Sequence, residues 1–165
     1  FAGVRGSEFF GDDRQPGEHC RVADIEVPHE DVTRLSMGDG SLRHILSFDV
    51  LEHVPGYASA LTEFSRVLEP GGTLLLSVPF DLDSEANLTR ASVQPDGSIT
   101  HHEPPEYHGD PVNSEGGVLC FYRFGWALLD ELRAVGFREV RMAIYWNPHR
   151  AYLGWPGTLI TAVRA

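Results

Sequence analysis

A compact group of side chains with chemical potential lies within ten residues in the second half of the chain. It consists of His101, His102, Glu103, Tyr107, His108 and Asp110. A His-x-Glu spacing with a second His can form a facial metal triad. That triad needs a barrel-like scaffold, which the sequence does not indicate, so we expect no metal site. Two interpretations stay open: a polar loop with solvated or hydrogen-bonded imidazoles, and a substrate-binding segment that uses His101, Tyr107 and His108.

This cluster belongs to a long polar segment, residues 81–121, that interrupts the rhythm of strands and helices. The segment is rich in turn-forming residues, among them Pro104, Pro105 and Gly109. Loops of this length inside a compact domain are usually functional or disordered. We therefore expect one domain over residues 1–165, with residues 81–121 as an insertion and a candidate lid over an acceptor.

The elements that must position the insertion are clearest just before it. Residues 42–51 have the apolar character of a buried strand that runs into a loop. Leu61, Phe64 and Leu68 recur at helical spacing and predict an amphipathic helix. Residues 69–78 first break the helix with Glu-Pro-Gly-Gly and then form an apolar run typical of a strand covered on both faces. Together these elements predict a βαβ unit with a right-handed crossover.

The amino-terminal elements are less regular. We expect a strand within residues 1–10 that ends near Glu8, and a loop over residues 11–20, which are rich in turn formers. A short strand within residues 22–32 should end at residues 29–31.

The carboxyl-terminal elements follow the insertion. Residues 124–135 predict a second amphipathic helix, and residues 139–146 and 158–163 predict two strands that close the fold as an antiparallel hairpin. The fold class is therefore α/β, a Rossmann-like and mostly parallel sheet with an antiparallel hairpin at its carboxyl end.

Composition and charge narrow the functional classes. The 165 residues fit one domain, and a formal charge of −11 disfavours nucleic-acid binding and adhesion to anionic membranes. All 13 basic residues are arginine, which excludes Schiff-base and P-loop lysine chemistry. No apolar run is long enough for a membrane helix. Two distant cysteines, Cys20 and Cys120, predict reduced thiols in a cytoplasmic protein.

Several residues at predicted strand ends suit a nucleoside ligand. Glu8, Asp31 and the pair Ser47-Phe48 all fall at such ends. Ligands of open α/β sheets bind at the carboxyl ends of the strands. A carboxylate there can accept hydrogen bonds from both hydroxyl groups of a ribose.

The segment that carries the most specific signal runs from Ser47 to Phe80. It contains Asp-Val-Leu-Glu-His-Val at residues 49–54, followed by Glu-x-x-Arg-Val-Leu-x-Pro-Gly-Gly at residues 63–72. At this spacing the segment resembles class I S-adenosylmethionine-dependent methyltransferases, of the methyltransferase type 11 kind. The resemblance extends less sharply over the rest of the chain.

The resemblance implies a set of site residues. Glu8 would bind the ribose of S-adenosylmethionine, and Asp31 with the backbone N–H of Val32 would bind the adenine. Ser47 and Phe48 would line the cofactor near its sulfonium. His53 would lie close to the methyl group, where it is either a general base or a residue that packs or caps a helix start.

The resemblance also exposes two missing parts. The family's first strand and the Gly-rich loop after it have no match, and the chain begins with Phe1. We therefore expect a domain truncated at its amino end. The implied function is methyl transfer to a small-molecule acceptor. The alternative is a non-catalytic binding or scaffold protein of the same fold. A Rossmann oxidoreductase is disfavoured because no G-x-G-x-x-G follows a strand.

Overall fold

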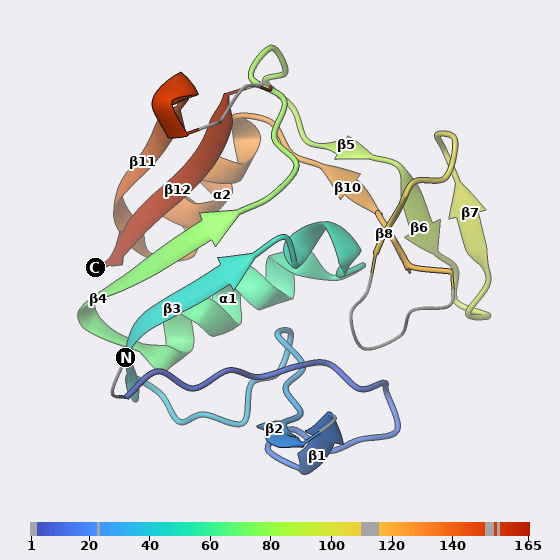
Figure 1. The fold of residues 1–165 in the computed structure, drawn as a ribbon, viewed down its shortest axis with the longest axis vertical. Coiled ribbons are helices and arrows are strands. Elements are labelled where there is room, and N and C mark those ends of the chain that lie inside the picture. Colours follow the sequence, from blue (N-terminus) through green and yellow to red (C-terminus); the bar gives the residue numbers. More distant parts are fainter. Residues whose placement is uncertain (1–2, 23, 110–115, 151–153, 155) are drawn as a thin grey trace.

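A mixed four-stranded sheet organises the molecule (Figure 1). The computed structural model describes residues 3–22, 24–109, 116–150, 154 and 156–165. The strand order is β11-β12-β4-β3, with bounds Phe137–Tyr145, Gly157–Arg164, Leu68–Ser77 and Leu42–Phe48. β3 and β4 are parallel, whereas β12 is antiparallel to both of its neighbours. The expected parallel pair and carboxyl-terminal hairpin are both present. The expectation of a mostly parallel sheet was wrong for the described residues, because only the β3–β4 pairing of the three in this sheet is parallel.

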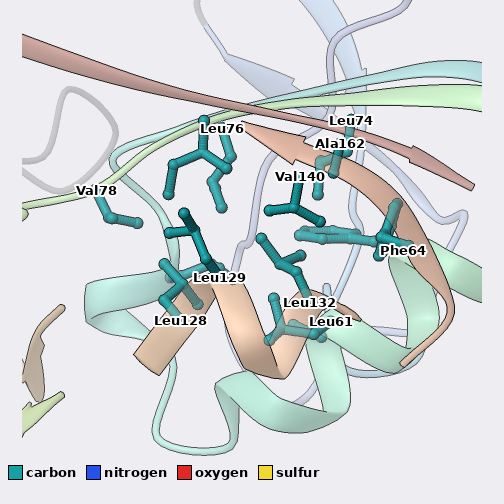
Figure 2. Packing of buried hydrophobic residues seen from close by; sticks show 14 of the residues in the cluster. Leu61, Phe64, Leu74, Leu76, Val78, Leu128, Leu129, Leu132, Val140 and Ala162 are labelled. Atoms are coloured by element: carbon teal, nitrogen blue, oxygen red, sulfur yellow. The ribbon is translucent and has the colours of Figure 1, made fainter. Parts of the chain in front are cut away.

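Two helices cover one face of this sheet. α1 (Tyr57–Val67) connects β3 to β4, and α2 (Ala127–Ala134) precedes β11. Phe64 of α1 and Leu132 of α2 are buried against Leu74 and Ala162 of the sheet (Figure 2). Burial of this apolar face is the main stabilising contribution, at about 25 cal/mol per Å² of apolar surface. The predicted βαβ unit and second helix are confirmed.

The outer edge of β3 lies at the margin of the sheet. In the described part of the chain, β4 is the only strand that pairs with β3. Leu46 and Phe48 of β3 are 55% and 49% exposed. These apolar side chains therefore lie beside open space rather than in the core.

The amino-terminal prediction was partly wrong. Residues 3–10 form no strand, and a single parallel bridge joins Glu8 to His29. Gly3, with φ of 89°, and Gly6 interrupt this segment, which has no long partner strand to pair with. The strand expected within residues 22–32 is present as β2 (Ile25–Pro28), although it ends at Pro28 and not at residues 29–31. It pairs as an antiparallel hairpin with β1 (His19–Val22), which was not expected. β1 therefore begins inside the expected loop.

The segment 81–121 carries small strands of its own beyond the arrowheads of β3 and β4 (Figure 1). They are β5 (Leu88–Thr89), β6 (Ala91–Val93), β7 (Ile99–His101), β8 (Tyr107–His108) and β9 (Val118–Leu119). β6 pairs with β7 and β8 with β9, while β5 pairs with β10 (Tyr122–Arg123). A minor cluster of Ala91, Leu119 and Phe121 is buried beneath them.

Two short 3-10 helices complete the fold. η1 (Leu51–His53) follows β3, and η2 (Pro148–Arg150) follows β11. Within the described residues, no helix has both the length and the apolar character that crossing a membrane requires.

Candidate functional site

An open cleft of about 950 Å³ lies between the amino-terminal segment and the carboxyl end of β3. Its walls contain all the residues expected to bind the cofactor: Glu8, Asp31, Val32, Ser47 and Phe48. His53 also lines the cleft. The structure therefore brings together six residues that are separated by up to 45 positions in the sequence.

Backbone pairing places Glu8 at this cleft. The N–H of Glu8 donates to the carbonyl of Pro28 at 3.1 Å, and the carbonyl of Glu8 accepts from the N–H of Glu30 at 3.0 Å. Among the described residues, the Glu8 carboxylate accepts only a local hydrogen bond, from the N–H of Phe9. The hairpin β1–β2 thus positions Glu8 although no regular strand contains it.

The carboxylate of Asp31 is held by its own loop. Oδ1 accepts from the backbone N–H and the hydroxyl of Thr33, at 2.9 and 2.7 Å, and Oδ2 accepts from Nε of Arg34 at 3.0 Å. Partial burial opposes ionisation of Asp31, but these hydrogen bonds outweigh it and lower its pKa. Asp31 is therefore a fixed negative charge beside Val32.

The end of β3 presents a polar atom and an aromatic ring. Ser47 is buried, and its Oγ lacks a hydrogen-bond partner among the described residues. Phe48 is half-exposed to the cleft. Asp49 follows with a left-handed backbone (φ of 52°) and accepts a hydrogen bond from the hydroxyl of Ser77. Sequence reasoning missed Asp49 as a cleft residue, although its place after a predicted strand was a usable signal.

Glu52 and His53 lie in η1 at the far end of the cleft. Glu52 is fully buried, and neither carboxylate oxygen has a well-formed hydrogen bond within the described chain. Burial, reinforced by the charge of Asp49, raises the pKa of Glu52 to about 7. Nδ1 of His53 lies 2.9 Å from the carbonyl of Leu119. Sequence reasoning gave Glu52 no role, although it stands in the motif at residues 49–54.

The three residues expected to bind an acceptor are separated. His108 packs edge-on against His53, with ring centroids 5.0 Å apart. His101 is exposed in β7 and Tyr107 is 54% exposed, and neither lines the cleft. Asp110 lies outside the described residues. Of the predicted substrate-binding residues, only His108 is thus placed next to the candidate site.

The sequence is similar to known methyltransferases over part of its length. Residues 10–76 match the methyltransferase domain family. Over 60 residues, or 36% of this chain, the sequence is 34% identical to a probable S-adenosylmethionine-dependent methyltransferase of Mycolicibacterium smegmatis. Over 63 residues it is 32% identical to a ubiquinone biosynthesis O-methyltransferase of Methylococcus capsulatus. These alignments span 23% and 27% of the two relatives, about a quarter of their length.

Solved structures share the fold over most of the chain. An S-adenosylmethionine-dependent methyltransferase of Methanosarcina mazei matches with a TM-score of 0.53 and 20% identity, over 84% of this chain and 66% of its own. One from Mesorhizobium loti matches with a TM-score of 0.52 and 16% identity, over 87% and 72%. In sequence over residues 10–76, and in fold over most of its length, this chain is therefore similar to S-adenosylmethionine-dependent methyltransferases.

Proposed function

We propose that this chain binds S-adenosylmethionine in the cleft beside β3 and takes part in methyl transfer to a small-molecule acceptor. The observation that carries the proposal is that Glu8, Asp31, Ser47 and Phe48, from three separate segments, line one cleft. When bound, S-adenosylmethionine supplies a methyl group that is already activated by a positively charged sulfur.

The chemistry of the cleft fits this cofactor. Its carboxylates, Glu8 and Asp31, can accept hydrogen bonds from the ribose and the adenine amino group. The buried and unpaired Oγ of Ser47 offers a further polar contact. The exposed ring of Phe48 offers an apolar surface, and aromatic faces also attract cations such as a sulfonium. A volume of about 950 Å³ is within the range of cofactor sites.

The protein's contribution to the reaction is chiefly to hold the reacting groups in line. A group that is already activated for displacement gains most from proximity and alignment. The acceptor would enter where η1 and the segment 81–121 meet, since His53, Gly109 and Val118 line that end of the cleft.

One observation favours the alternative, a non-catalytic binding protein of this fold. The Asp31 carboxylate is already engaged by Thr33 and Arg34, so part of its hydrogen-bonding capacity is used within the chain. These residues donate three hydrogen bonds to Asp31, so only one of its roughly four acceptor sites would remain for adenine. A measurement of cofactor binding distinguishes the methyltransferase from the non-catalytic binding protein.

Calorimetry with S-adenosylhomocysteine tests the proposal on the 165-residue chain. We expect saturable binding at one site, weakened about tenfold, or ~1.4 kcal/mol, by Phe48→Ala. Ile144→Ala is the matched control, because Ile144 is an equally exposed apolar residue that does not line the cleft. Absence of heat with a chain that is folded by circular dichroism would refute the proposal and support the non-catalytic alternative.

A further inference from the structure

A cluster of nitrogen and sulfur ligands lies where the segment 81–121 meets η1. One ligand atom from each of His53, His108 and Cys120 lies within 4.8 Å of the other two. The Cys120 sulfur is 3.9 Å from Nδ1 of His53, and the two imidazole rings are in edge-to-face contact. Cys120 is buried, and both histidines are partly buried.

Backbone hydrogen bonds fix the three ligands in place. β8 and β9 pair His108 with Val118, and the N–H of Cys120 donates to the carbonyl of Glu106 at 2.9 Å. The N–H of Phe121 donates to the carbonyl of Glu52 at 2.7 Å. The group is therefore held by regular contacts between distant segments and is not a chance meeting of mobile surface side chains.

Glu52 supplies an independent indication that a cation belongs here. Its carboxylate is fully buried, and both oxygens lack a hydrogen-bond partner in the part of the chain that is described. Oε1 lies 3.5 Å from Nδ1 of His108 and 3.8 Å from Nε2 of His53. A buried acid without a partner is costly, whereas carboxylates commonly accept the outer N–H of metal-bound histidines.

We propose that His53, His108 and Cys120 bind a zinc-class divalent cation. Glu52 would position the imidazole of His108, and the carbonyl of Leu119, 2.9 Å from Nδ1 of His53, would position that of His53. Two imidazoles and one thiolate match the ligand preference of Zn²⁺, and three protein ligands leave a fourth position open. In a zinc site with zinc–ligand distances of roughly 2.0–2.3 Å, the three ligand atoms would lie about 1 Å closer to one another than they do here. In this arrangement His53 is a ligand and not a general base.

The cation would join the segment 81–121 to the end of β3. His53 lies in η1, whereas His108 and Cys120 lie in and beside the hairpin β8–β9. His53 also lines the cleft, so the open position would stand at the acceptor end. Binding of the metal alone does not depend on the proposed methyl transfer, and it can be tested without an acceptor.

Metal titration of the chelator-treated chain tests the proposal. We expect one Zn²⁺ per chain in competition with a chromophoric chelator, and a thiolate-to-cobalt charge-transfer band when Co²⁺ replaces Zn²⁺. Cys120→Ser should remove that band, whereas the control Cys20→Ser should keep it. Glu52→Gln should weaken Zn²⁺ binding roughly 10- to 100-fold and keep the band.

Histidine variants provide a second test of the proposal in case Cys120→Ser does not fold. His108→Ala should weaken Zn²⁺ binding at least as much as Glu52→Gln, while His102→Ala, an exposed neighbour in the same segment, should not. The proposal is overturned if the folded wild-type chain binds no Zn²⁺. It is equally overturned if Cys120→Ser keeps the cobalt band, or if His102→Ala and His108→Ala weaken binding alike.

Discussion

Glu63 and Arg66 form a two-point ion pair one turn apart on α1 that also holds the segment before β3. Nε and Nη2 of Arg66 donate to the two oxygens of Glu63, each at 2.7 Å. The same guanidinium donates to the carbonyls of Leu35 and Met37, and Glu63 accepts from the N–H of Leu35. An isolated pair at this spacing stabilises a helix by only about 0.2–0.5 kcal/mol. Here the pair also connects α1 to residues 35–37, which precede β3.

Replacement of Arg66 by Gln should lower the melting temperature by a few degrees at pH 7. Hydrogen bonds from Arg66 lower the pKa of Glu63, so this stabilisation is present above the unfolded pKa of about 4.3. It is lost as the pH falls through the lower folded pKa. The difference from wild type should therefore shrink below pH 4 in thermal scans. Arg138→Gln, an exposed arginine on β11, is the control, and an equal effect of both variants would contradict the prediction.

Gly72→Ala should destabilise the fold by about 1–3 kcal/mol, because close packing leaves no room for a side chain. A Cβ at Gly72 would lie 2.8 Å from the carbonyl oxygen of Glu69 and 3.1 Å from that of Arg43. Gly38→Ala is the matched control, since its Cβ would meet nothing within 4 Å. Urea unfolding measures both variants, and a Gly72 variant as stable as the Gly38 variant would show that β3 and β4 are not this close.

Asp31→Ala should weaken binding of S-adenosylhomocysteine by about 1–3 kcal/mol, the cost of leaving a polar partner unsatisfied. Asp96 offers an unusually close control. It accepts from the N–H and hydroxyl of Ser98, as Asp31 does from Thr33, but it lies in the turn between β6 and β7. Asp96→Ala removes the same local hydrogen bonds and should leave affinity unchanged in calorimetry. Similar affinities of the two variants would refute the adenine site at Asp31.

The sequence predicts the βαβ unit and the carboxyl-terminal hairpin well because their apolar periodicity is local. Leu61 and Phe64 mark the buried face of α1, and Leu68, the first residue of β4, is buried as well. β1 and its pairing with β2 were missed because each strand has only four residues, half-exposed or exposed throughout. Such strands depend on pairing, and pairing is not visible in a residue pattern.

The cleft was predictable at the level of strand ends, but the cluster beside it was not. A sequence pattern predicts that an acid such as Glu52 lies at the surface, because full burial of an acid is rare. In the structure Glu52 is fully buried. His108 and Tyr107 are adjacent in the sequence, yet alternation along β8 separates them, so that His108 meets His53 and Tyr107 is exposed. The partners of His108 come from tertiary contacts with η1, which composition and spacing do not encode.

Glu131→Gln should make the protein more stable at pH 8 than wild type and reduce the pH dependence of its unfolding. Oε1 of Glu131 accepts from the hydroxyl of Tyr57 at 3.1 Å and from Nδ2 of Asn87 at 2.9 Å. Burial raises the pKa of Glu131 despite these hydrogen bonds. A raised folded pKa contributes stability that is present below the unfolded pKa, about 4.3, and is lost as the pH rises through the folded pKa. Gln keeps an acceptor for Tyr57 and carries no charge, so the advantage of the variant should grow between pH 4 and pH 8 in thermal scans. Asp130→Asn, which changes the exposed neighbouring acid, is the control and should not reproduce this trend. Parallel pH profiles of wild type and Glu131→Gln would show that ionisation of Glu131 does not destabilise the fold.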